Sequence, residues 1–478
     1  MKLTGIFINR GSPVPLSKQL ESALRDAILC GQLSPGERLL SSRDFQTHLG
    51  LARNTIVNAL DQLHAEGYLH TLHGVGTFVS QMTGHVPSED RPRASRPASL
   101  SHRAPRYFEA QGLAANMRHT VPFRPGMPAL DMFPTAQFRR SFQTAAWTTD
   151  LLDYGSPLGR LSLREAISKR LRQTRGIVCS ADDIVITNGA QSAFALVART
   201  LLNPADIVIV EDPGYANVRA MMIAEGLQIF GAPVDEQGID VASFPKRARL
   251  VFVTPSHQYP SGVVLSLERR FALLNWAAKN DAWIVEDDYD AEFNYTNRPQ
   301  PALQGLDAEG RVIYAGTFSK VLSPALRIAY LVMPRALKPA FEAIHSVTGG
   351  APSAVLQAAL AHFIETGSFS RHVTRMRKVY DERRCFVRDE FLKQAGAHFE
   401  IQDSRAGLHF IARLQKGASD VRVSERAAVR GLIVPALSSY YHDSPPRNGL
   451  VIGYAVAPPA LARTAIAMLS EIAKDAAT

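Results

Sequence analysis

The spacing of apolar residues predicts three short helices and a hairpin in the first eighty residues. Leu16, Leu20, Leu24 and Ile28 recur every four positions after Pro15, the pattern of a helix that buries one face. The elements expected after it are a short helix from Ser41-Ser42 to Leu49-Gly50, a helix that carries Ile56, Ala59, Leu60 and Leu63 and ends at Gly67, and a hairpin around Gly74-Val75-Gly76. Three helices followed by a hairpin describe a winged helix-turn-helix.

The pattern changes after residue 120, where apolar runs alternate with helical segments. Strands are expected at 183–187, 206–210, 250–254, 282–285 and 311–315. Their apolar residues are continuous instead of alternating, as in parallel strands that helices cover on both faces. Each run ends in a polar or glycine-containing turn, so the chemistry is expected at one edge of the sheet. This part is predicted to be α/β, with a mostly parallel sheet.

Residues 81–120, between these two parts, are rich in proline, arginine and serine. Such a composition does not bury enough apolar surface to fold alone, and its prolines favour an extended tether. The alternative is a surface loop, but about forty residues is long for a loop inside one compact domain. We therefore expect a small module over 10–80, a linker over 81–120 and a large domain over 121–478.

Length and composition exclude some classes of protein. A chain of 478 residues with 46% hydrophobic residues suggests two or three globular domains, and no apolar run approaches the roughly 18 residues that span a bilayer. The three cysteines lie far apart without metal-ligand spacing, so we expect reduced thiols in a cytoplasmic protein, no metal and no membrane contact. The net charge of +9 is spread along the chain and does not by itself identify a nucleic-acid-binding part.

The third helix of the N-terminal module opens with Arg53-Asn54-Thr55, whose side chains suit contacts with bases and phosphates in the major groove. A bare three-helix pattern is equally typical of a domain that binds protein. The sequence further resembles the DNA-binding domain of the GntR regulator family, through Gly31-Gln32-Leu33-Ser34-Pro35-Gly36-Glu37-Arg38-Leu39, Ser41-Ser42-Arg43, Arg53-Asn54-Thr55, Leu63-His64-Ala65-Glu66-Gly67-Tyr68 and Gly76-Thr77-Phe78. The resemblance implies DNA contacts by Arg43, Arg53, Asn54, Thr55, His73 and Gly74.

Lys320 follows the strand expected at 311–315, at the sheet edge where such folds bind ligands. A lysine held in a pocket can form a Schiff base with a carbonyl cofactor, of which pyridoxal phosphate is the commonest. Two other strand ends carry matching groups. Thr187-Asn188-Gly189 leads into a helix whose free amides suit a phosphate, and Glu286-Asp287-Asp288-Tyr289 brings carboxylates and a phenol to the same edge. Alone, each of these is also compatible with an ordinary surface feature.

Together, residues 121–478 resemble the fold-type I aminotransferases, with a smaller C-terminal α+β subdomain. The resemblance implies that Lys320 is the Schiff-base lysine, that Asp287 faces the pyridine nitrogen with Asp288 as its rival, and that Tyr289 lies near the ring hydroxyl. It further implies ring stacking by Tyr215 and phosphate contacts by Gly189, Ala190, Gln191, Thr317 and Arg327. Tyr154, in Tyr154-Gly155-Ser156-Pro157-Leu158-Gly159, would reach the phosphate of the partner subunit's cofactor in a homodimer.

Two positions depart from that pattern. His257-Gln258-Tyr259-Pro260 stands where many aminotransferases have Asn-Pro, and Val451 stands where they commonly hold the arginine that binds the substrate carboxylate. A GntR-type module joined to such a domain resembles the MocR subfamily of transcription regulators. That resemblance implies a regulator that binds operator DNA and responds to pyridoxal phosphate, or to an amine or amino acid that forms an external aldimine with it. The alternative is a pyridoxal-phosphate-dependent aminotransferase with an accessory DNA-binding domain.

Overall fold

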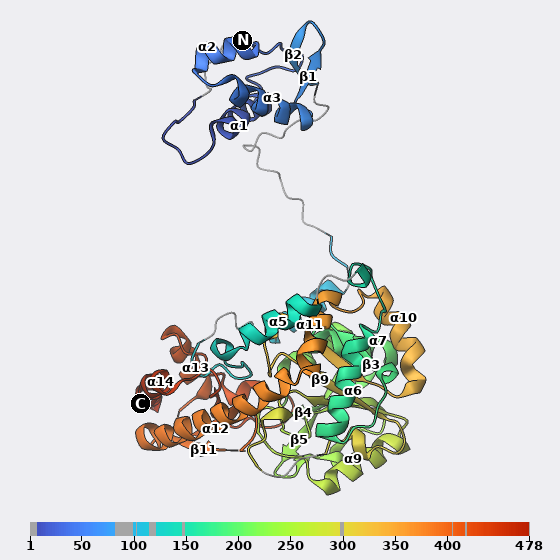
Figure 1. Cartoon of the computed structure of the whole chain (residues 1–478). Coiled ribbons are helices and arrows are strands. Elements are labelled where there is room, and N and C mark those ends of the chain that lie inside the picture. The colour runs from blue at the N-terminus through green and yellow to red at the C-terminus, as the bar shows by residue number, and fades with distance from the viewer. Residues whose placement is uncertain are drawn as a thin grey trace. The chain divides into compact units, whose positions relative to one another are not determined.

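The computed structural model describes residues 7–81, 99–101, 103–113, 121–145, 149–296, 301–403, 405–415 and 418–477. Contacts within the chain divide it into two compact units, Met1–Ser99 and Leu100–Thr478 (Figure 1). Each unit has a buried core of its own. Among the described residues, no helix is long and apolar enough to cross a membrane.

The N-terminal unit consists of three helices and a hairpin, drawn in blue in Figure 1. Its elements are α1 (Leu16–Leu29), α2 (Ser42–Leu49), α3 (Arg53–Ala65), β1 (Leu69–Leu72) and β2 (Gly76–Val79). Side chains such as Leu24, Phe45 and Ile56 form one core. Arg25 Nη2 of α1 lies 2.6 Å from Glu66 Oε2, just past α3, and this ion pair ties the two helices together. The expected winged helix-turn-helix is therefore confirmed as a fold.

An eight-stranded sheet forms the centre of the C-terminal unit. In spatial order its strands are β3 (Ile184–Thr187), β10 (Ala329–Val332), β9 (Val312–Thr317), β8 (Trp283–Asp288), β7 (Ala248–Val253), β4 (Ile207–Asp212), β5 (Gln228–Asp235) and β6 (Gly238–Ile239). The run from β9 to β5 is parallel, whereas β10 is antiparallel to both β3 and β9, and β6 is antiparallel to β5. The five expected strands are present, and the sheet is mostly parallel as predicted.

Helices cover both faces of this sheet. They include α7 (Ala190–Leu201), α8 (Ala216–Ala224) and α10 (Lys338–Val347) on one face, and α9 (Leu267–Lys279) on the other. Val285 of β8 packs in the same core as Phe194 of α7, whereas its neighbour Ile284 packs with Leu273 of α9. Successive residues of one strand thus pack into the hydrophobic cores on opposite faces of the sheet. Both faces need apolar side chains, which explains why the strands are continuous apolar runs.

A smaller subdomain contains the C-terminal part of the chain. Its three-stranded antiparallel sheet has the order β11 (Phe399–Gln402), β12 (His409–Leu414) and β13 (Gly449–Gly453). The accompanying helices are α12 (Ser368–Ala395), α13 (Asp420–Val429) and α14 (Pro459–Ala477), and α5 (Thr135–Ala145), α6 (Leu161–Arg175) and α11 (Ala354–Glu365) complete the unit. The long helix α12, orange in Figure 1, packs on α14 and β11. The unit therefore has the expected α/β architecture with an α+β subdomain.

Part of the expected linker is helical, which corrects the interpretation of 81–120 as an extended tether throughout. Residues Ala104–Leu113 form helix α4, which packs against α8. Ala110 of α4 is buried together with Ala220 and Ala224. The prolines and arginines that suggested an extended chain are concentrated before this helix, whereas Ala110 of the helix is buried by tertiary packing against α8. Residues 82–98, 102 and 114–120 lie outside the described part of the chain.

Candidate functional site

Lys320 lies three residues beyond the end of β9, as the sequence predicts. Its Nζ donates a hydrogen bond to the carbonyl oxygen of Gly126 at 2.8 Å. Burial lowers the pKa of Lys320, the negative charges of Asp287 and Asp290 oppose this effect, and the positive charge of Arg124 adds to it. An amine with a lowered pKa is more often unprotonated, which makes it a nucleophile toward carbonyl carbon.

Asp287 and Asp288 differ in their surroundings, because successive residues of β8 point to opposite faces of the sheet. Asp288 Oδ2 lies 2.7 Å from Arg175 Nε and accepts a hydrogen bond from the Tyr314 hydroxyl at 2.5 Å. Asp287 instead interacts with Lys320. Its burial and the nearby charge of Asp288 raise its pKa to about 8, and the Lys320 charge opposes this rise. Of the two rivals, Asp287 is the carboxyl on the Lys320 side.

The expected phosphate loop lies at the N-terminus of α7. Gly189 precedes the helix with a φ of 82°, and a Cβ at this position would lie 3.2 Å from the guanidinium carbon of Arg327. Arg327 Nη2 donates to the Asn188 carbonyl oxygen at 3.3 Å. The side-chain nitrogen of Gln191, in the first turn of α7, is buried without a hydrogen-bond partner among the described residues. Free amides, a guanidinium and an unsatisfied amide nitrogen form a donor set that fits a phosphate.

Adjacent strands bring the remaining phosphate candidates to the same edge. Ala329 of β10 pairs with Thr187 on one side and with Thr317 on the other, so the ends of β3 and β9 flank it. The Thr317 hydroxyl accepts from the Ser319 N–H at 3.2 Å. Ala190 opens α7 directly after the loop. The structure therefore gathers the sequence-predicted phosphate residues along one edge of the sheet.

Aromatic side chains line the site beside Asp287. Tyr215 immediately precedes α8, and both its burial and the charge of Asp287 raise its pKa. Its ring packs edge-on against Tyr259, with centroids 5.8 Å apart, and Tyr259 packs in the same way against Tyr289 at 5.9 Å. The flat surface that a heteroaromatic ring requires is thus available next to the acid expected to face its nitrogen.

Two further positions from the sequence analysis do not supply polar groups to this arrangement: Val451, named there as a departure from the aminotransferase pattern, and Tyr154. Val451 of β13 is fully buried in an apolar cluster with Ile411, Leu437 and Tyr440, so this strand position offers hydrocarbon where many aminotransferases offer a cation. Tyr154 is fully exposed and does not contribute to the site of its own chain.

Sequence reasoning missed three residues near Lys320, namely Gly126, Asp290 and His409. Gly126 accepts the Lys320 hydrogen bond, the charge of Asp290 acts on Lys320, and Lys320 contributes to lowering the pKa of His409. Asp290 directly follows the Glu286–Tyr289 motif, and that proximity is the signal that was available. The other two come from distant segments that only the tertiary fold brings together.

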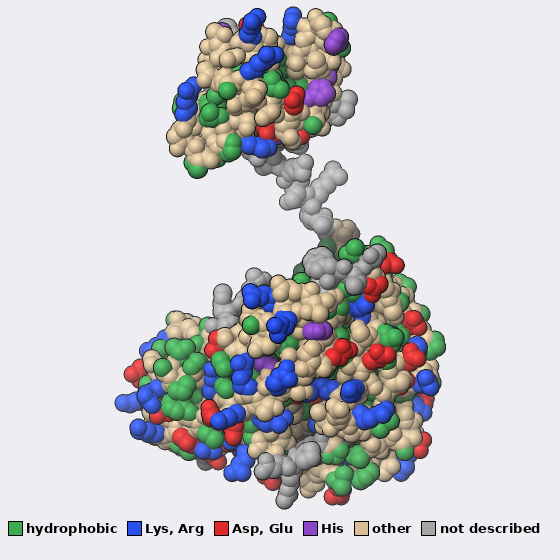
Figure 2. Space-filling model, viewed as in Figure 1, with side chains coloured by type: hydrophobic (Ala, Val, Ile, Leu, Met, Phe, Trp, Pro, Cys, Tyr) green, Lys and Arg blue, Asp and Glu red, His purple; other side chains and the backbone are tan. Residues whose placement is uncertain are grey.

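The residues expected to contact DNA are arranged on the surface of the N-terminal unit. Arg43, Arg53, Asn54, His73 and Gly74 are exposed and Thr55 is half-buried. Arg53 is the first residue of α3, and His73 and Gly74 form the turn between β1 and β2. On the face shown in Figure 2, Lys and Arg side chains of the C-terminal unit are dispersed among acidic ones. The expectation of DNA contacts comes instead from the exposed N-terminus of α3 and the β1–β2 turn of the N-terminal unit.

Comparisons with known proteins agree with this division. Residues 16–79 match the family "Bacterial regulatory proteins, gntR family", and residues 130–451 match "Aminotransferase class I and II". The chain is 36% identical to the probable rhizopine catabolism regulatory protein MocR of Rhizobium meliloti, over 96% of this chain and 94% of that protein. It is 33% identical to the pyridoxine biosynthesis transcriptional regulator PdxR of Corynebacterium glutamicum, over 94% of each. Among solved structures, an archaeal alanine:glyoxylate aminotransferase superposes with a TM-score of 0.70 at 25% identity, covering 79% of this chain and 96% of that one.

Proposed function

The chain belongs to the MocR subfamily of GntR-type transcription regulators, and we propose that it binds pyridoxal 5'-phosphate at Lys320 and uses that site to control its binding to operator DNA. The observation that carries this proposal is the pairing of Lys320 with Asp287 in a chain that also presents an exposed α3 N-terminus. The aminotransferase class I and II fold is one that uses pyridoxal phosphate.

The residues at the sheet edge fit each part of this cofactor. Lys320 would hold the aldehyde carbon, Asp287 the ring nitrogen, Tyr289 the ring oxygen and Tyr215 the ring face. The phosphate would be held by Gly189, Ala190, Gln191, Thr317 and Arg327. When bound, pyridoxal phosphate supplies an electron sink for amines attached to it. The chain's own contribution is to keep the Lys320 amine reactive and to place a carboxylate against the ring nitrogen.

The effector of this regulator is proposed to be pyridoxal phosphate itself, or an amine or amino acid that reacts at the bound cofactor. The alternative, a working aminotransferase with an accessory DNA-binding domain, is favoured by the intact Lys320 and Asp287. It is disfavoured by Val451, because the apolar cluster around this position does not offer the charge that binds a substrate carboxylate. Slow turnover at the same site is compatible with a sensor, and rapid turnover is not expected.

A homodimer completes the proposal. Tyr154 is fully exposed, and Leu152, two residues before it, exposes 73% of its surface. Both side chains are thus accessible to a partner subunit. In the dimer, Tyr154 would reach the cofactor phosphate of the other subunit, and the two winged helices would read paired half-sites. The module at 10–80 would act on operator DNA and the domain at 121–478 on the effector. As a bacterial regulator of transcription, the protein would work in the cytoplasm.

Absorption spectroscopy and DNA titration test the two halves of the proposal separately. The purified protein should be yellow, with an absorption band that borohydride abolishes, and Lys320→Ala should lose this band. Lys279→Ala, at an exposed lysine of α9, is the matched control and should keep it. A band that survives in the Lys320→Ala variant would refute the assignment of the cofactor lysine.

Operator affinity should respond to ligands at this site. A coupling free energy of roughly 1–3 kcal/mol would change DNA affinity about 5–150-fold. The measurement is a gel-shift titration with and without pyridoxal phosphate and candidate amines, run beside an assay for 2-oxo acid formation. Rapid multiple turnover together with DNA affinity that no ligand changes would favour the aminotransferase instead.

A further inference from the structure

A buried group of polar side chains behind Tyr289 has no part in the proposed cofactor contacts. His257 lies in the loop after β7, Asp290 two residues after β8, and His409 at the start of β12. Each exposes no more than 2% of its surface. Burying three such groups together is costly unless they interact, so their arrangement calls for a role.

The contacts within this group converge on one nitrogen atom. His257 Nδ1 lies 3.1 Å from Asp290 Oδ2 and 3.0 Å from the Tyr289 hydroxyl oxygen. A carboxylate only accepts hydrogen bonds, so with Asp290 ionised the proton resides on His257 Nδ1. The Tyr289 oxygen on the same side of the ring then accepts from this N–H as well. Its own O–H is left to donate in another direction, toward the cofactor side of the ring.

The main chain holds the His257–Asp290 pair in place. Gly407 has a φ of 74°, and a Cβ there would lie 2.2 Å from His257 Cε1 and 2.5 Å from Asp290 Oδ2. The Gly407 carbonyl oxygen accepts from the hydroxyls of Tyr295 and Tyr454, each at 2.6 Å. The backbone at Gly407 therefore lies directly against the His257–Asp290 pair, and a side chain at position 407 would displace it.

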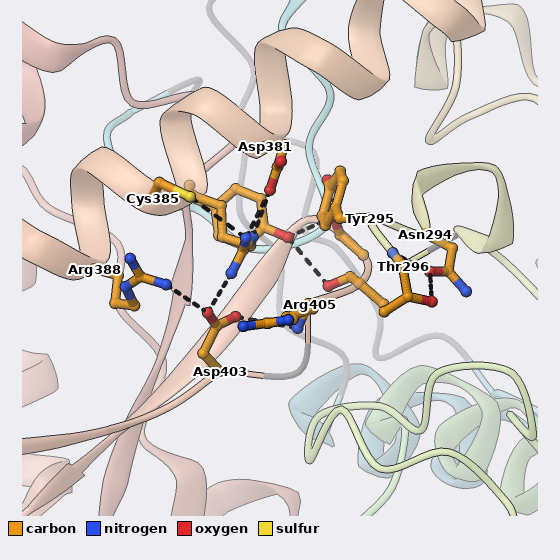
Figure 3. A network of polar contacts seen from close by, with 12 residues as sticks. Asn294, Tyr295, Thr296, Asp381, Cys385, Arg388, Asp403 and Arg405 are labelled. Carbon is orange, nitrogen blue, oxygen red and sulfur yellow. Dashed lines mark hydrogen bonds and ion pairs between the residues drawn. The ribbon is translucent and has the colours of Figure 1, made fainter. Parts of the chain in front are cut away.

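Ion pairs and hydrogen bonds hold the segment before Gly407, and Figure 3 shows Asp381, Asp403 and Arg405 in this network. Arg384 of α12 pairs with Asp381 and with Asp403, and Asp403 also accepts from the Arg405 N–H at 3.2 Å. The Arg405 carbonyl oxygen accepts from the Tyr295 N–H at 3.1 Å. The loop before β12 is thus tied to α12 and to residue 295, and these contacts hold Gly407 in place beside the His257–Asp290 pair.

His409 packs against His257 as a neutral ring. Its Nε2 contacts the Pro260 carbonyl oxygen at 3.0 Å, and its ring centroid lies 5.2 Å from that of His257. Burial and the neighbouring His257 lower the pKa of His409 to about 3, so it is neutral at physiological pH. A neutral His409 adds no charge beside the His257–Asp290 pair.

We propose that His257, oriented by Asp290, positions the Tyr289 hydroxyl as a hydrogen-bond donor to the ring oxygen of the cofactor. Many aminotransferases have an asparagine directly before the proline of this loop, where this chain has Tyr259. His257 and Asp290 are positioning residues that act through Tyr289. This inference rests on the proposed cofactor site and adds the residues that control its electronic state.

A double-mutant cycle in the cofactor-loaded full-length protein tests the proposal. Donation to the ring oxygen withdraws electron density that otherwise stabilises the protonated lysine–cofactor linkage. Losing it should therefore raise the pH at which the absorption band titrates, by about one unit or more. We expect this rise for Tyr289→Phe, for His257→Ala and for the nearly isosteric Asp290→Asn. In the Tyr289→Phe background, the other two changes should add nothing, because they act through the phenol.

The control is His345→Gln, at an equally buried histidine whose Nε2 contacts the Ile186 carbonyl oxygen, and it should leave the titration unchanged. Additive shifts in the double variants would overturn the positioning role while leaving the cofactor site intact. Stoichiometric metal in the purified protein that is lost in His409→Ala would also overturn it, because the three residues would then be ligands. Wild-type protein without any cofactor band would overturn both this inference and the proposed function.

Discussion

At the scale of single residues, the adjacent carboxyl groups of Asp287 and Asp288 have different partners and different expected roles. Asp288 forms an ion pair with Arg175 and accepts a hydrogen bond from Tyr314, whereas Asp287 faces Lys320 and has a raised pKa. The sequence places two adjacent carboxylates at a strand end without distinguishing them. The alternation of side chains along β8 makes the distinction, and it becomes visible only when the partners on each face are known.

Substituting these two carboxylates should therefore give opposite phenotypes. Asp287→Asn should weaken cofactor binding and change its absorption band with little effect on folding, because an amide does not stabilise a protonated ring nitrogen. Asp288→Asn should keep the band but reduce the free energy of unfolding by about 3–5 kcal/mol, because it removes the charge facing buried Arg175. Cofactor titration and urea denaturation measure the two effects. Equal loss of cofactor affinity in both variants would contradict this assignment.

Buried carboxyl groups also determine how stability depends on pH. Burial raises the pKa of Glu211 and of Glu286 to about 7, and that of Asp287 to about 8. The same groups titrate near pH 4 in an unfolded chain. Between about pH 4 and pH 8 these three carboxyl groups hold more protons in the folded protein than in the unfolded one, so their contribution to the free energy of unfolding falls as pH rises. Buried His345, His372 and His409, whose pKa values are lowered by burial, act in the opposite direction below about pH 6.5. The fall in stability is therefore expected between about pH 6.5 and pH 8.

Urea denaturation of cofactor-free protein at several pH values across this window measures the slope. Glu211→Gln should flatten it, because the variant no longer takes up a proton on folding at this position. An exposed acid gives the matched control, and Glu236→Gln should leave the slope unchanged. Stability that rises from pH 7 to pH 8, above the range in which histidines titrate, would show that these carboxyl groups are ionised in the folded protein.

At the scale of elements, the α3 N-terminus is the clearest functional feature of the N-terminal unit. Arg53→Ala should weaken operator binding by about 1–3 kcal/mol if it contacts a base, and Arg43→Ala should reduce the salt slope by about one. His64→Ala changes an exposed residue at the opposite end of α3 and should have no effect. Gel-shift titrations at several salt concentrations test all three. Unchanged affinity in an Arg43/Arg53 double variant would refute the major-groove assignment.

Helix α4 gives a second prediction at this scale. Ala110→Glu would place a charged side chain against Ala220 and Ala224 of α8 and so detach α4 from α8. We expect faster trypsin cleavage at Arg103 and Arg106, and a reduced effect of ligands on operator affinity, with the cofactor band unchanged. Glu109→Gln alters an exposed residue of the same helix and is the control. If Ala110→Glu left ligand response intact, α4 would have no part in coupling the two units.

The sequence was sufficient for most elements and for most of the candidate site. Apolar runs predicted five strands of the central sheet, and the motifs at their ends predicted Lys320, Asp287 and the Gly189 turn. Helix α4 was missed because its stability comes from the surface of α8, which composition does not reveal. Gly407 and His409 were missed for a similar reason, since they reach His257 only through packing between β12 and the loop after β7.

At the scale of the whole molecule, the proposed homodimer would make cofactor binding a property of both subunits, because Tyr154 of one would reach the cofactor phosphate of the other. Lys320→Ala and Tyr154→Ala homodimers should each bind pyridoxal phosphate poorly. Mixing them should restore about a quarter of the sites, because half of the randomly formed dimers would each contain one intact site. The absorption band measures this recovery. Failure to recover any band in mixtures that have exchanged subunits would mean that Tyr154 does not act across the interface.

The docking of α4 also limits the reach of the DNA-binding modules. β2 ends at Val79 and α4 begins at Ala104, which leaves about 24 residues, 80–103, as the connection. A fully extended chain spans at most about 3.3–3.6 Å per residue, so each connection is at most ~80 Å long, against ~140 Å if it continued to residue 120. In the proposed homodimer, two such connections would limit the distance between the half-sites that the two DNA-binding modules can reach together. A ligand that released α4 from α8 would lengthen each connection and so increase this distance.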